Sequence, residues 1–127
     1  MKRVILVDDS LFIRKQLKLF LEEELSFEVI ATGSNGNEAV DLYKEHKPDL
    51  LFLDLTMPEK SGSEALAEIL SFDSSARILI CSAIKDAGQI TECLEFGASA
   101  FIKKPLLFQD PDFVEEMKED IQEALED

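Results

Sequence analysis

Short apolar segments alternate with longer amphipathic segments five times along the chain. The apolar segments are rich in branched side chains, and those that are apolar throughout are typical of strands covered on both faces of a parallel sheet. The segments between them are long enough to form helices, so the pattern does not favour hairpins. We predict strands at residues 3–7, 27–32, 50–53, 77–81 and 100–102.

The amphipathic segments carry apolar side chains at the spacing of one helix face. In the first segment the apolar positions follow the order i, i+4, i+7 and i+8, and charged residues occupy the remaining faces. In the last segment the apolar positions recur every fourth residue. These residues are Ile13, Leu17, Phe20, Leu21 and Leu25 in the first helix, and Phe113, Met117, Ile121 and Leu125 in the last.

Residues that can cap helices stand at the starts of these segments. Their side chains accept hydrogen bonds from backbone N–H groups that have no partner in the first helical turn. Gly97 is predicted to end the fourth helix, because glycine adopts positive φ without steric cost. The predicted capping residues are Ser10, Asn35 or Asn37, Ser61 and Asp110.

Strands that alternate with helices imply right-handed crossovers and an α/β fold, with a doubly wound five-stranded parallel sheet and helices on both faces. The chain has 127 residues and no composition typical of a linker, so we expect a single domain over residues 1–127. In such sheets the ligand site lies beyond the carboxyl ends of the strands. The residues that follow each strand are therefore the first candidates for chemistry.

Polar residues follow four of the five predicted strands. Asp8 and Asp9 follow the first strand, Asp54 the third and Ser82 the fourth, and the segment 103–105, Lys-Lys-Pro, follows the fifth. Three carboxylates in one crevice repel each other and lose hydration, so a divalent cation is expected to offset their charge. Hard oxygen ligands without histidine or thiolate favour Mg²⁺ or Mn²⁺.

A carboxylate, a metal ion, a hydroxyl and an ammonium group together form a set that can hold a phosphoryl group during transfer. The carboxylate attacks in line, while the metal, lysine and hydroxyl bind the phosphoryl oxygens. The alternative for each residue taken alone is a structural role, because Asp often ends strands and begins turns.

The composition narrows the range of partners. The net charge is −14, which argues against nucleic acids and anionic membranes as binding partners. Residues 110–127 hold nine acids and one lysine, a net charge of −8. This segment predicts a partner with a basic surface whose affinity falls with salt, and the alternative is a solvated helix face.

No segment has the pattern of a signal peptide or a membrane span, so we expect a cytoplasmic protein. The two cysteines, Cys81 and Cys93, form neither a disulfide framework nor a zinc site and are predicted to be buried thiols. His46 stands alone in a polar segment and is predicted to face solvent.

Four sequence blocks together resemble the receiver domain of two-component response regulators. They are Val-Asp-Asp-Ser at 7–10, Leu-Phe-Leu-Asp-Leu-Thr-Met-Pro at 51–58, Cys-Ser-Ala at 81–83 and Gly-Ala-Ser-Ala-Phe-Ile-Lys-Lys-Pro at 97–105. The blocks occur in the family's order and at similar spacing over the whole chain. The resemblance implies a flavodoxin-like sheet with strand order 2-1-3-4-5.

The resemblance also implies roles for the acids. Asp54 resembles the phosphoacceptor that takes a phosphoryl group from the phosphohistidine of a histidine kinase. Asp8 and Asp9 resemble the acid pair that binds Mg²⁺ together with Asp54 and the backbone carbonyl of Thr56.

Three further residues match the family's switch and cation positions. Ser82 resembles the switch hydroxyl, and Phe101 resembles the aromatic residue that turns inward on activation. The family's lysine precedes a proline that is usually cis, which selects Lys104, while strand alternation places Lys103 on the opposite face.

The chain departs from the family pattern at two places. Thr56 and Ile84 occupy positions that tune loss of the phosphoryl group, and an aliphatic side chain at 84 cannot activate water, so we expect slow dephosphorylation. The connection after Pro105 is longer than usual. Its apolar residues 106–108 are expected to pack locally, and the alternative is an exposed patch for a partner.

We therefore expect a stand-alone receiver that catalyses only its own phosphotransfer and dephosphorylation. A sensor histidine kinase or a histidine phosphotransfer protein would supply the phosphoryl group, and a downstream protein would bind the face formed by the fourth helix, fifth strand and last helix. The protein would be a monomer or a phosphorylation-dependent dimer. The Asp-Asp-Ser start followed by Phe12 and Arg14 favours chemotaxis or motility.

Two alternatives belong to other functional classes. A Mg²⁺-dependent phosphohydrolase would also use a strand-end aspartate as its nucleophile, but such enzymes need an acid at the position of Thr56. A scaffold with an inactive site would not need the intact set of acids, hydroxyl and lysine.

Overall fold

The strands form one parallel sheet, as the sequence predicted. In the computed structural model, which describes residues 1–126, the strand order is β2-β1-β3-β4-β5, so the predicted order is confirmed. Asp127, which the predicted domain and acidic segment include, lies outside the described residues. The strands are β1 Arg3–Val7, β2 Glu28–Gly33, β3 Leu50–Leu53, β4 Ile78–Ser82 and β5 Ala100–Lys103.

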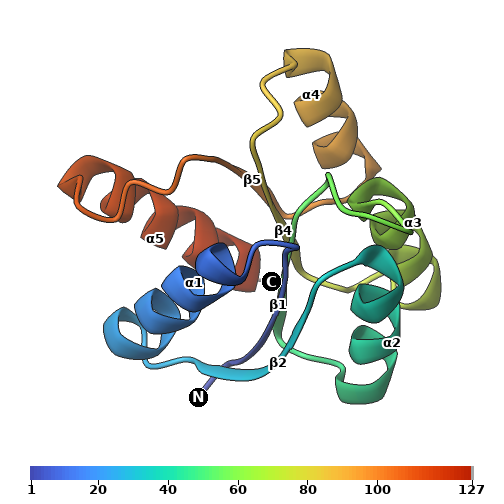
Figure 1. The fold of residues 1–127 in the computed structure, drawn as a ribbon, viewed down its shortest axis with the longest axis horizontal. Helices are drawn as coiled ribbons and strands as arrows, with labels where there is room; N and C mark the ends of the chain where they lie inside the picture. The colour runs from blue at the N-terminus through green and yellow to red at the C-terminus, as the bar shows by residue number, and fades with distance from the viewer. Residues whose placement is uncertain (127) are drawn as a thin grey trace.

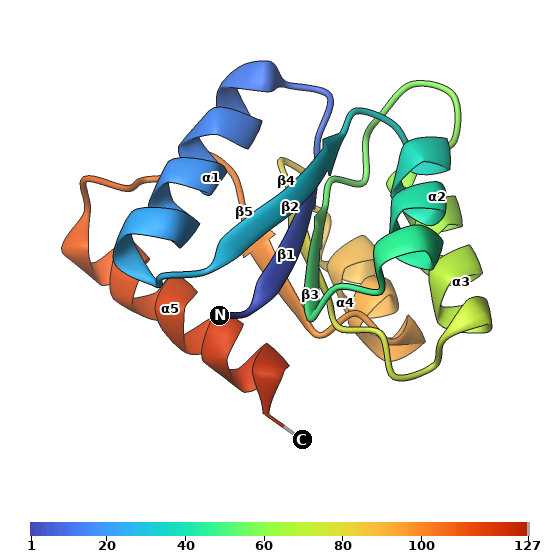
Figure 2. The same cartoon turned by 90° about the horizontal axis from the view of Figure 1, so that it is seen from below.

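The helices cover both faces of the sheet (Figure 1, Figure 2). One apolar core lies between the sheet and α1 and α5, and the other lies between the sheet and α2, α3 and α4. The helices are α1 Leu11–Glu24, α2 Gly36–His46, α3 Gly62–Phe72, α4 Ala87–Phe96 and α5 Pro111–Leu125.

The central strands are buried because both of their faces are covered. Every residue of β3 and β4 is buried, whereas the edge strands β2 and β5 are partly exposed. Each large apolar side chain that is removed from water contributes about 1.5–3 kcal/mol before entropy is counted. The two cores therefore hold the central strands most firmly. The polar residues that directly follow these strands are held in place with them.

Three strands end one residue later than predicted. The parallel ladder pairs Val7 with Gly33 and Ser82 with Lys103, so β2, β4 and β5 continue over residues that an apolar pattern does not include. β2 also begins one residue late, since the Phe27 N–H donates to the Leu21 carbonyl in the preceding turn. β4 likewise begins at Ile78 rather than at residue 77.

The helix caps follow the predicted chemistry. Ser10, Asn35 and Ser61 accept bonds from backbone N–H groups three residues later, and Asp110 accepts from the N–H two residues later. Asn35, rather than Asn37, begins α2. α4 begins after Asp86, a cap that was not predicted from the sequence.

Gly97 ends α4 as predicted. Its φ is 135°, in the region that favours glycine, and its N–H donates to the Cys93 and Leu94 carbonyls. A Cβ at this position would lie 2.9 Å from a methyl carbon of Leu70. Glycine is therefore required both for the turn and for the close approach to α3.

The loop between β5 and α5 packs mainly against its own domain. Leu106 is buried, and the Phe108 ring stacks on Phe20 with a centroid distance of 5.0 Å and meets Phe113 edge-on at 6.4 Å. The prediction of local packing is correct for these two residues. It is wrong for Leu107, whose side chain is 47% exposed.

Both cysteines are free and buried, as predicted. Burial raises the pKa of the Cys81 thiol to about 12, so it stays protonated at neutral pH. His46 is partly exposed, with its Nε2 3.6 Å from a Glu45 carboxylate oxygen. Among residues 1–126, no helix is both long and apolar enough to cross a bilayer.

Candidate functional site

Buried polar residues gather where the central strands end. β1, β3 and β4 are neighbours and run parallel, so Asp8, Asp54 and Ser82 emerge at the same edge of the sheet. Their exposed fractions are only 3%, 5% and 1%. Burying a polar group costs free energy unless the group finds a hydrogen-bond or charge partner. Three buried polar side chains at one edge of the sheet therefore indicate a functional site there.

Three carboxylates meet at this edge. Asp8, Asp9 and Asp54 each offer an oxygen atom, and these atoms lie within 4.8 Å of one another. Asp9 is exposed, whereas the other two acids are buried. Clustered oxygen donors that are partly open to solvent fit a hard divalent cation that keeps some of its water.

Lys104 reaches into the acid cluster. Its Nζ lies 2.7 Å from an Asp8 oxygen and 3.3 Å from an Asp54 oxygen, and the Lys104–Pro105 peptide bond is cis, as predicted. Lys103 points elsewhere, toward a hollow beside α5 that Phe113 also lines. Of the two adjacent lysines, Lys104 is thus the one that contacts the acids.

The charges of the site are strongly coupled. Burial raises the pKa of Asp54, and the neighbouring Asp8 raises it further, while the Lys104 charge acts in the opposite direction. Burial by itself lowers the pKa of Lys104, but the hydrogen bond to Asp8 and the charge of Asp54 outweigh it and raise that pKa. Additional positive charge would therefore stabilise the ionised form of Asp54.

Backbone groups orient the two buried carboxylates. The Ser10 N–H donates to Asp8 Oδ1 at 2.9 Å, and the Thr56 N–H donates to Asp54 Oδ1 at 3.4 Å. The other oxygen of each carboxylate contacts Lys104. Both side chains are thereby held in one orientation.

The remaining predicted residues surround this cluster. Ser82 lies at the end of β4, and its Oγ accepts a hydrogen bond from the Ile84 N–H at 3.4 Å. Thr56 is exposed in the loop after Asp54. Phe101 is one strand away on β5, where it is partly buried against the core beneath α2, α3 and α4.

Two residues contribute to the site in ways that the sequence did not indicate. The Arg14 guanidinium donates to the Asp8 carbonyl at 2.6 Å and so ties α1 to the end of β1. Gly62 packs so closely that a Cβ would collide with the Asp54 carbonyl oxygen. Neither contact has a sequence signal, because each depends on the distance between separate elements.

The arrangement combines a buried nucleophile, a cation and a hydroxyl. Asp54 offers a carboxylate oxygen, Lys104 an ammonium group and Ser82 an O–H group at adjacent strand ends. These groups can bind a phosphoryl group and share its negative charge.

The sequence is similar to curated chemotaxis proteins. It is 44% identical over 105 residues to the chemotaxis protein CheY of Listeria monocytogenes, covering 83% of this chain and 87% of that protein. It is 45% identical over 103 residues to CheY of Bacillus subtilis, covering 81% and 85%.

The fold is similar to solved receiver structures. The CheX–CheY–BeF₃–Mg²⁺ complex from Borrelia burgdorferi has a chain that aligns with a TM-score of 0.89 and 35% identity, covering 99% of this chain and 90% of that one. The response regulator domain of Thermotoga maritima CheB aligns with a TM-score of 0.85 and 33% identity, covering 98% and 96%. Residues 4–118 match the sequence model of the response regulator receiver domain family. The chain therefore belongs to the response regulator receiver domain family and is a CheY-like signalling domain of two-component systems.

Proposed function

We propose that Asp54 accepts a phosphoryl group from the phosphohistidine of a sensor histidine kinase or a histidine phosphotransfer protein. The observation that carries this proposal is the position of the Asp54 carboxylate, which is buried at a strand end and lies 3.3 Å from Lys104 Nζ. An Asp54 oxygen forms a bond to phosphorus while the bond between phosphorus and the histidine nitrogen breaks, and the imidazole leaves.

The other residues bind the transferred group. Lys104 turns from the free carboxylates to a phosphoryl oxygen, since both are anionic acceptors. Ser82 donates its O–H to another phosphoryl oxygen while its Oγ keeps the bond from Ile84. Phe101 then turns inward and changes the surface of β5, which alters affinity for a downstream protein.

The carboxylates of Asp8, Asp9 and Asp54 and the backbone carbonyl of Thr56 would hold Mg²⁺, or Mn²⁺ in its place. Clustering of the three carboxylate oxygens supports this assignment. When bound, the ion supplies positive charge that offsets the acids and the phosphoryl oxygens.

We also propose that the chain acts as a single domain, catalyses only its own phosphotransfer and dephosphorylation, and works in chemotaxis in the cytoplasm. Similarity to CheY proteins over most of their length supports the chemotaxis role. The two reduced, buried cysteines suit a cytoplasmic protein. Either a monomer or a phosphorylation-dependent dimer is consistent with this role.

Intact-mass spectrometry separates this function from its alternatives. The protein is incubated with acetyl phosphate and Mg²⁺, or with beryllofluoride, whose BeF₃ group stands in for the phosphoryl group. We expect a stable adduct in the wild type and none in Asp54→Asn. Turnover of a small phosphate ester would instead indicate a phosphohydrolase, and absence of both reactions a scaffold.

For the downstream partner, we propose the face formed by α4, β5 and α5. A hollow of about 270 Å³ beside α5 has Phe101, Phe113 and Met117 in its lining and Glu116 and Asp120 as its acids. These acids belong to the segment with net charge −8, which supports a partner with a basic surface.

Salt dependence tests the charge of this partner. A pull-down that compares beryllofluoride-treated and untreated protein identifies partners that prefer the activated state. Affinity of such a partner should fall several-fold between about 50 mM and about 300 mM NaCl. Binding that is independent of salt would contradict a basic contact surface.

A further inference from the structure

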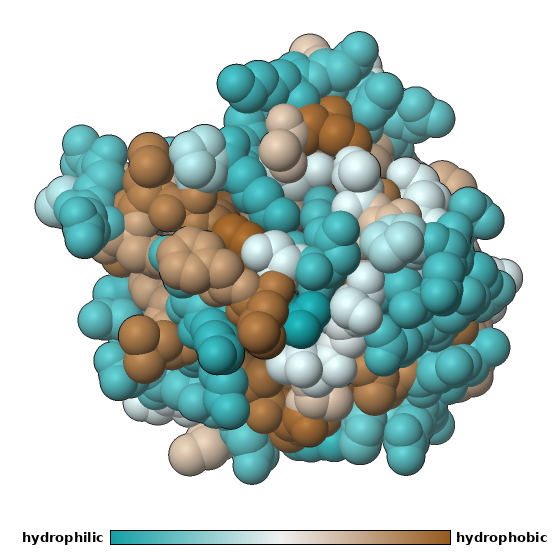
Figure 3. All heavy atoms as spheres, in the orientation of Figure 1, coloured by the Kyte–Doolittle hydropathy of each residue, from teal (hydrophilic) through white to brown (hydrophobic). Residues whose placement is uncertain are grey.

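The loop between β3 and α3 carries two of the groups proposed to hold the metal ion, the Asp54 carboxylate and the Thr56 carbonyl. Met57 packs partly against the core, but Thr56, Pro58 and Glu59 are exposed. In the view of Figure 3, the surface over α2 and α3 is mainly hydrophilic, so apolar burial does little to hold the loop there. The position of the loop therefore depends largely on polar contacts.

Two hydrogen bonds hold the ends of this loop near β3. The Gly62 N–H donates to the Leu55 carbonyl at 2.9 Å and closes the loop at its base. The Thr56 N–H donates to Asp54 Oδ1 at 3.4 Å. These bonds leave the middle of the loop, residues 57–60, to be held by another element.

The start of α2 holds the middle of the loop. The Gly36 N–H donates to the Lys60 carbonyl at 2.9 Å, and Figure 2 shows the loop arching over the start of α2. An N–H in the first turn of a helix has no partner within the helix, and the Lys60 carbonyl supplies one. The positive end of the helix dipole strengthens this bond to a carbonyl oxygen.

The two backbones lie so close that only glycine fits at position 36. Gly36 is buried, and a Cβ there would lie 2.3 Å from the Lys60 carbonyl oxygen and 2.8 Å from its carbonyl carbon. Ordinary contacts of a Cβ begin at about 3.4 Å, so the loop would have to move by about 1 Å. A movement of this size breaks the hydrogen bond between Gly36 and Lys60.

The side chain of Lys60 holds the loop less firmly than its backbone does. Lys60 Nζ lies 2.8 Å from a Glu68 carboxylate oxygen on α3, but the Glu68 side chain is 43% exposed. Exposed ion pairs contribute little because water screens them. Glu59, next to Lys60, has a φ of 63°, which a residue other than glycine keeps only where contacts on both sides fix the chain. The backbone contact with Gly36 is thus the main contact that fixes this part of the loop.

We propose that Gly36 is a positioning residue for the divalent cation: it holds the loop so that the Thr56 carbonyl stays beside the three carboxylates. This role rests on the proposed metal site, which Gly36 itself does not touch. The segment from Thr56 to Lys60 is short and is held at one end by Asp54 and at the other by Gly36. A displacement of Lys60 therefore moves the Thr56 carbonyl. Mg²⁺ demands nearly ideal octahedral geometry, so a displaced ligand weakens its binding.

Metal binding by Gly36→Ala tests this role. The probe is Mn²⁺, because free Mn²⁺ gives an electron paramagnetic resonance signal that the bound ion loses. We expect the variant to raise the dissociation constant of Mn²⁺ at least about fivefold. The Mg²⁺ concentration for half-maximal labelling by acetyl phosphate should rise by a similar factor. The maximal labelling rate should fall no more than about twofold, because excess metal fills the weakened site.

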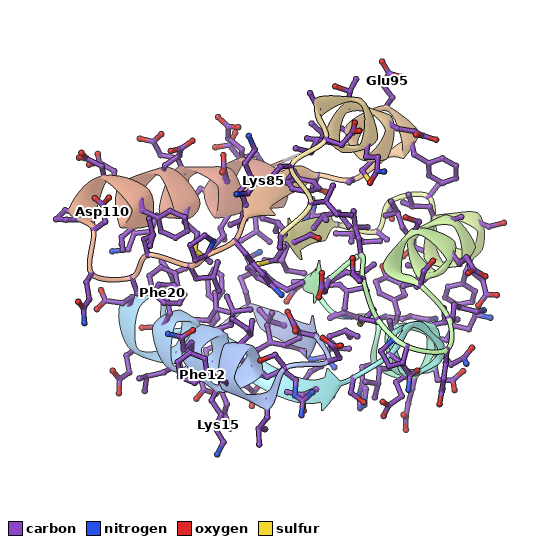
Figure 4. All side chains as sticks on the ribbon, turned by 45° about the horizontal axis from the view of Figure 1, so that its top comes forward. Phe12, Lys15, Phe20, Lys85, Glu95 and Asp110 are labelled. Atoms are coloured by element: carbon purple, nitrogen blue, oxygen red, sulfur yellow. The ribbon has the colours of Figure 1, made fainter. Side chains whose placement is uncertain are left out.

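Two control variants separate the backbone contact from other effects. Gly88→Ala changes a glycine in the first turn of α4, the helix whose Glu95 points away from the rest of the molecule in Figure 4. A Cβ there would be clear of backbone, with an Asp86 carboxylate oxygen at 3.1 Å. Glu68→Gln removes the charge that pairs with Lys60 and keeps the backbone contact. Both controls should bind Mn²⁺ within about twofold of the wild type.

Amide hydrogen exchange tests the same contact in the wild type. Energetic coupling is reciprocal, so if the contact favours metal binding, the metal favours the contact by the same factor. Saturation with Mg²⁺ should therefore slow exchange of the Gly36 N–H at least about fivefold, as measured by nuclear magnetic resonance. The Ile90 N–H, which donates to the Asp86 carbonyl at 3.1 Å in the first turn of α4, serves as the reference and should be unaffected.

Three results would overturn the proposal: wild-type Mn²⁺ affinity in folded Gly36→Ala, equal weakening in either control variant, or exchange of the Gly36 N–H that Mg²⁺ does not slow. Circular dichroism checks folding, and if Gly36→Ala does not fold, the exchange measurement on the wild type decides. A wild type that binds no Mn²⁺ would refute the proposed metal site, and the role of Gly36 with it. Normal binding by the wild type and by folded Gly36→Ala would refute the role of Gly36 alone.

Discussion

At the scale of single residues, the two lysines at the end of β5 differ more than their adjacency suggests. Lys104 contacts Asp8 and Asp54, whereas Lys103 is exposed toward α5. Alternation of side chains along a strand explains the difference. A matched pair of substitutions can therefore separate a role in the site from a general effect of charge.

We predict that Lys104→Met slows phosphorylation by acetyl phosphate at least about tenfold, because hydrogen bonds to charged groups contribute about 1.5–3 kcal/mol. Lys103→Met removes the same charge one residue away and should react at the wild-type rate. The rates are measured by intact-mass spectrometry in Mg²⁺. Equal rates for the two variants would contradict the role of Lys104.

We expect the side chain at position 84 to set the lifetime of the phosphoryl group on Asp54. The Ile84 side chain is partly buried against the core and has no group that can activate water. We expect Ile84→Glu to shorten the lifetime of phospho-Asp54 at least about tenfold. The decay is followed by mass spectrometry after acetyl phosphate is removed, with Ile84→Val as the control. An unchanged lifetime would show that position 84 does not limit hydrolysis.

At the scale of elements, the start of α3 packs directly against the backbone of Asp54 and Leu55. The Gly62 N–H donates to the Leu55 carbonyl at 2.9 Å, and a Cβ on Gly62 would collide with the Asp54 carbonyl oxygen. The loop from Asp54 to α3 can therefore close only with glycine at this position.

We predict that Gly62→Ala lowers the free energy of unfolding by at least about 2 kcal/mol, because backbone atoms must shift to accept the methyl group. Gly88→Ala in α4 is the control, since a Cβ there is 3.1 Å from the Asp86 carboxylate and clear of backbone. That change should stay within about 1 kcal/mol of the wild type. Urea unfolding measures both, and similar losses would argue against a specific collision at Gly62.

A side-chain contact also joins α2 to the end of α3. The Tyr43 hydroxyl donates to Asp73 Oδ2 at 2.8 Å, and the Tyr43 ring meets Phe72 edge-on. Hydrogen bonds from Ser75 and then from Tyr43 lower the pKa of Asp73. The ionised acid therefore stabilises the fold at pH values above its ordinary pKa near 3.8, and this contribution disappears as the pH falls below it.

We predict that Tyr43→Phe lowers the free energy of unfolding by about 1 kcal/mol at neutral pH. The ring stays, so the change isolates the hydroxyl. The difference from the wild type should shrink as the pH falls below 3.8 and through the lowered pKa of folded Asp73, where the acid becomes protonated. Urea titrations at both pH values test this, and an equal difference at each would mean that the Asp73 charge does not contribute.

At the scale of the whole molecule, the central architecture follows from the sequence. β1 and β3 have the predicted bounds, because in both strands an apolar run ends at the aspartate that follows the strand. β2, β4 and β5 each end one residue later than predicted, since the ladder extends over Gly33, Ser82 and Lys103, which the apolar pattern omits.

The site was predictable only in part. The strand-end rule located Asp8, Asp54 and Ser82, and the roles assigned from the family resemblance stay predictions. Contacts between distant elements had no sequence signal, as in Arg14 with the Asp8 carbonyl.

The residue that carries the phosphoryl group can be identified directly. After labelling with acetyl phosphate and Mg²⁺, borohydride reduces a phosphoaspartate to homoserine, and peptide mass spectrometry identifies the altered residue. We predict homoserine at position 54 in the wild type and no such product in folded Asp54→Asn. Modification at Asp8 or Asp9 instead, or equal labelling of Asp54→Asn, would contradict the assignment of Asp54 as the phosphoacceptor.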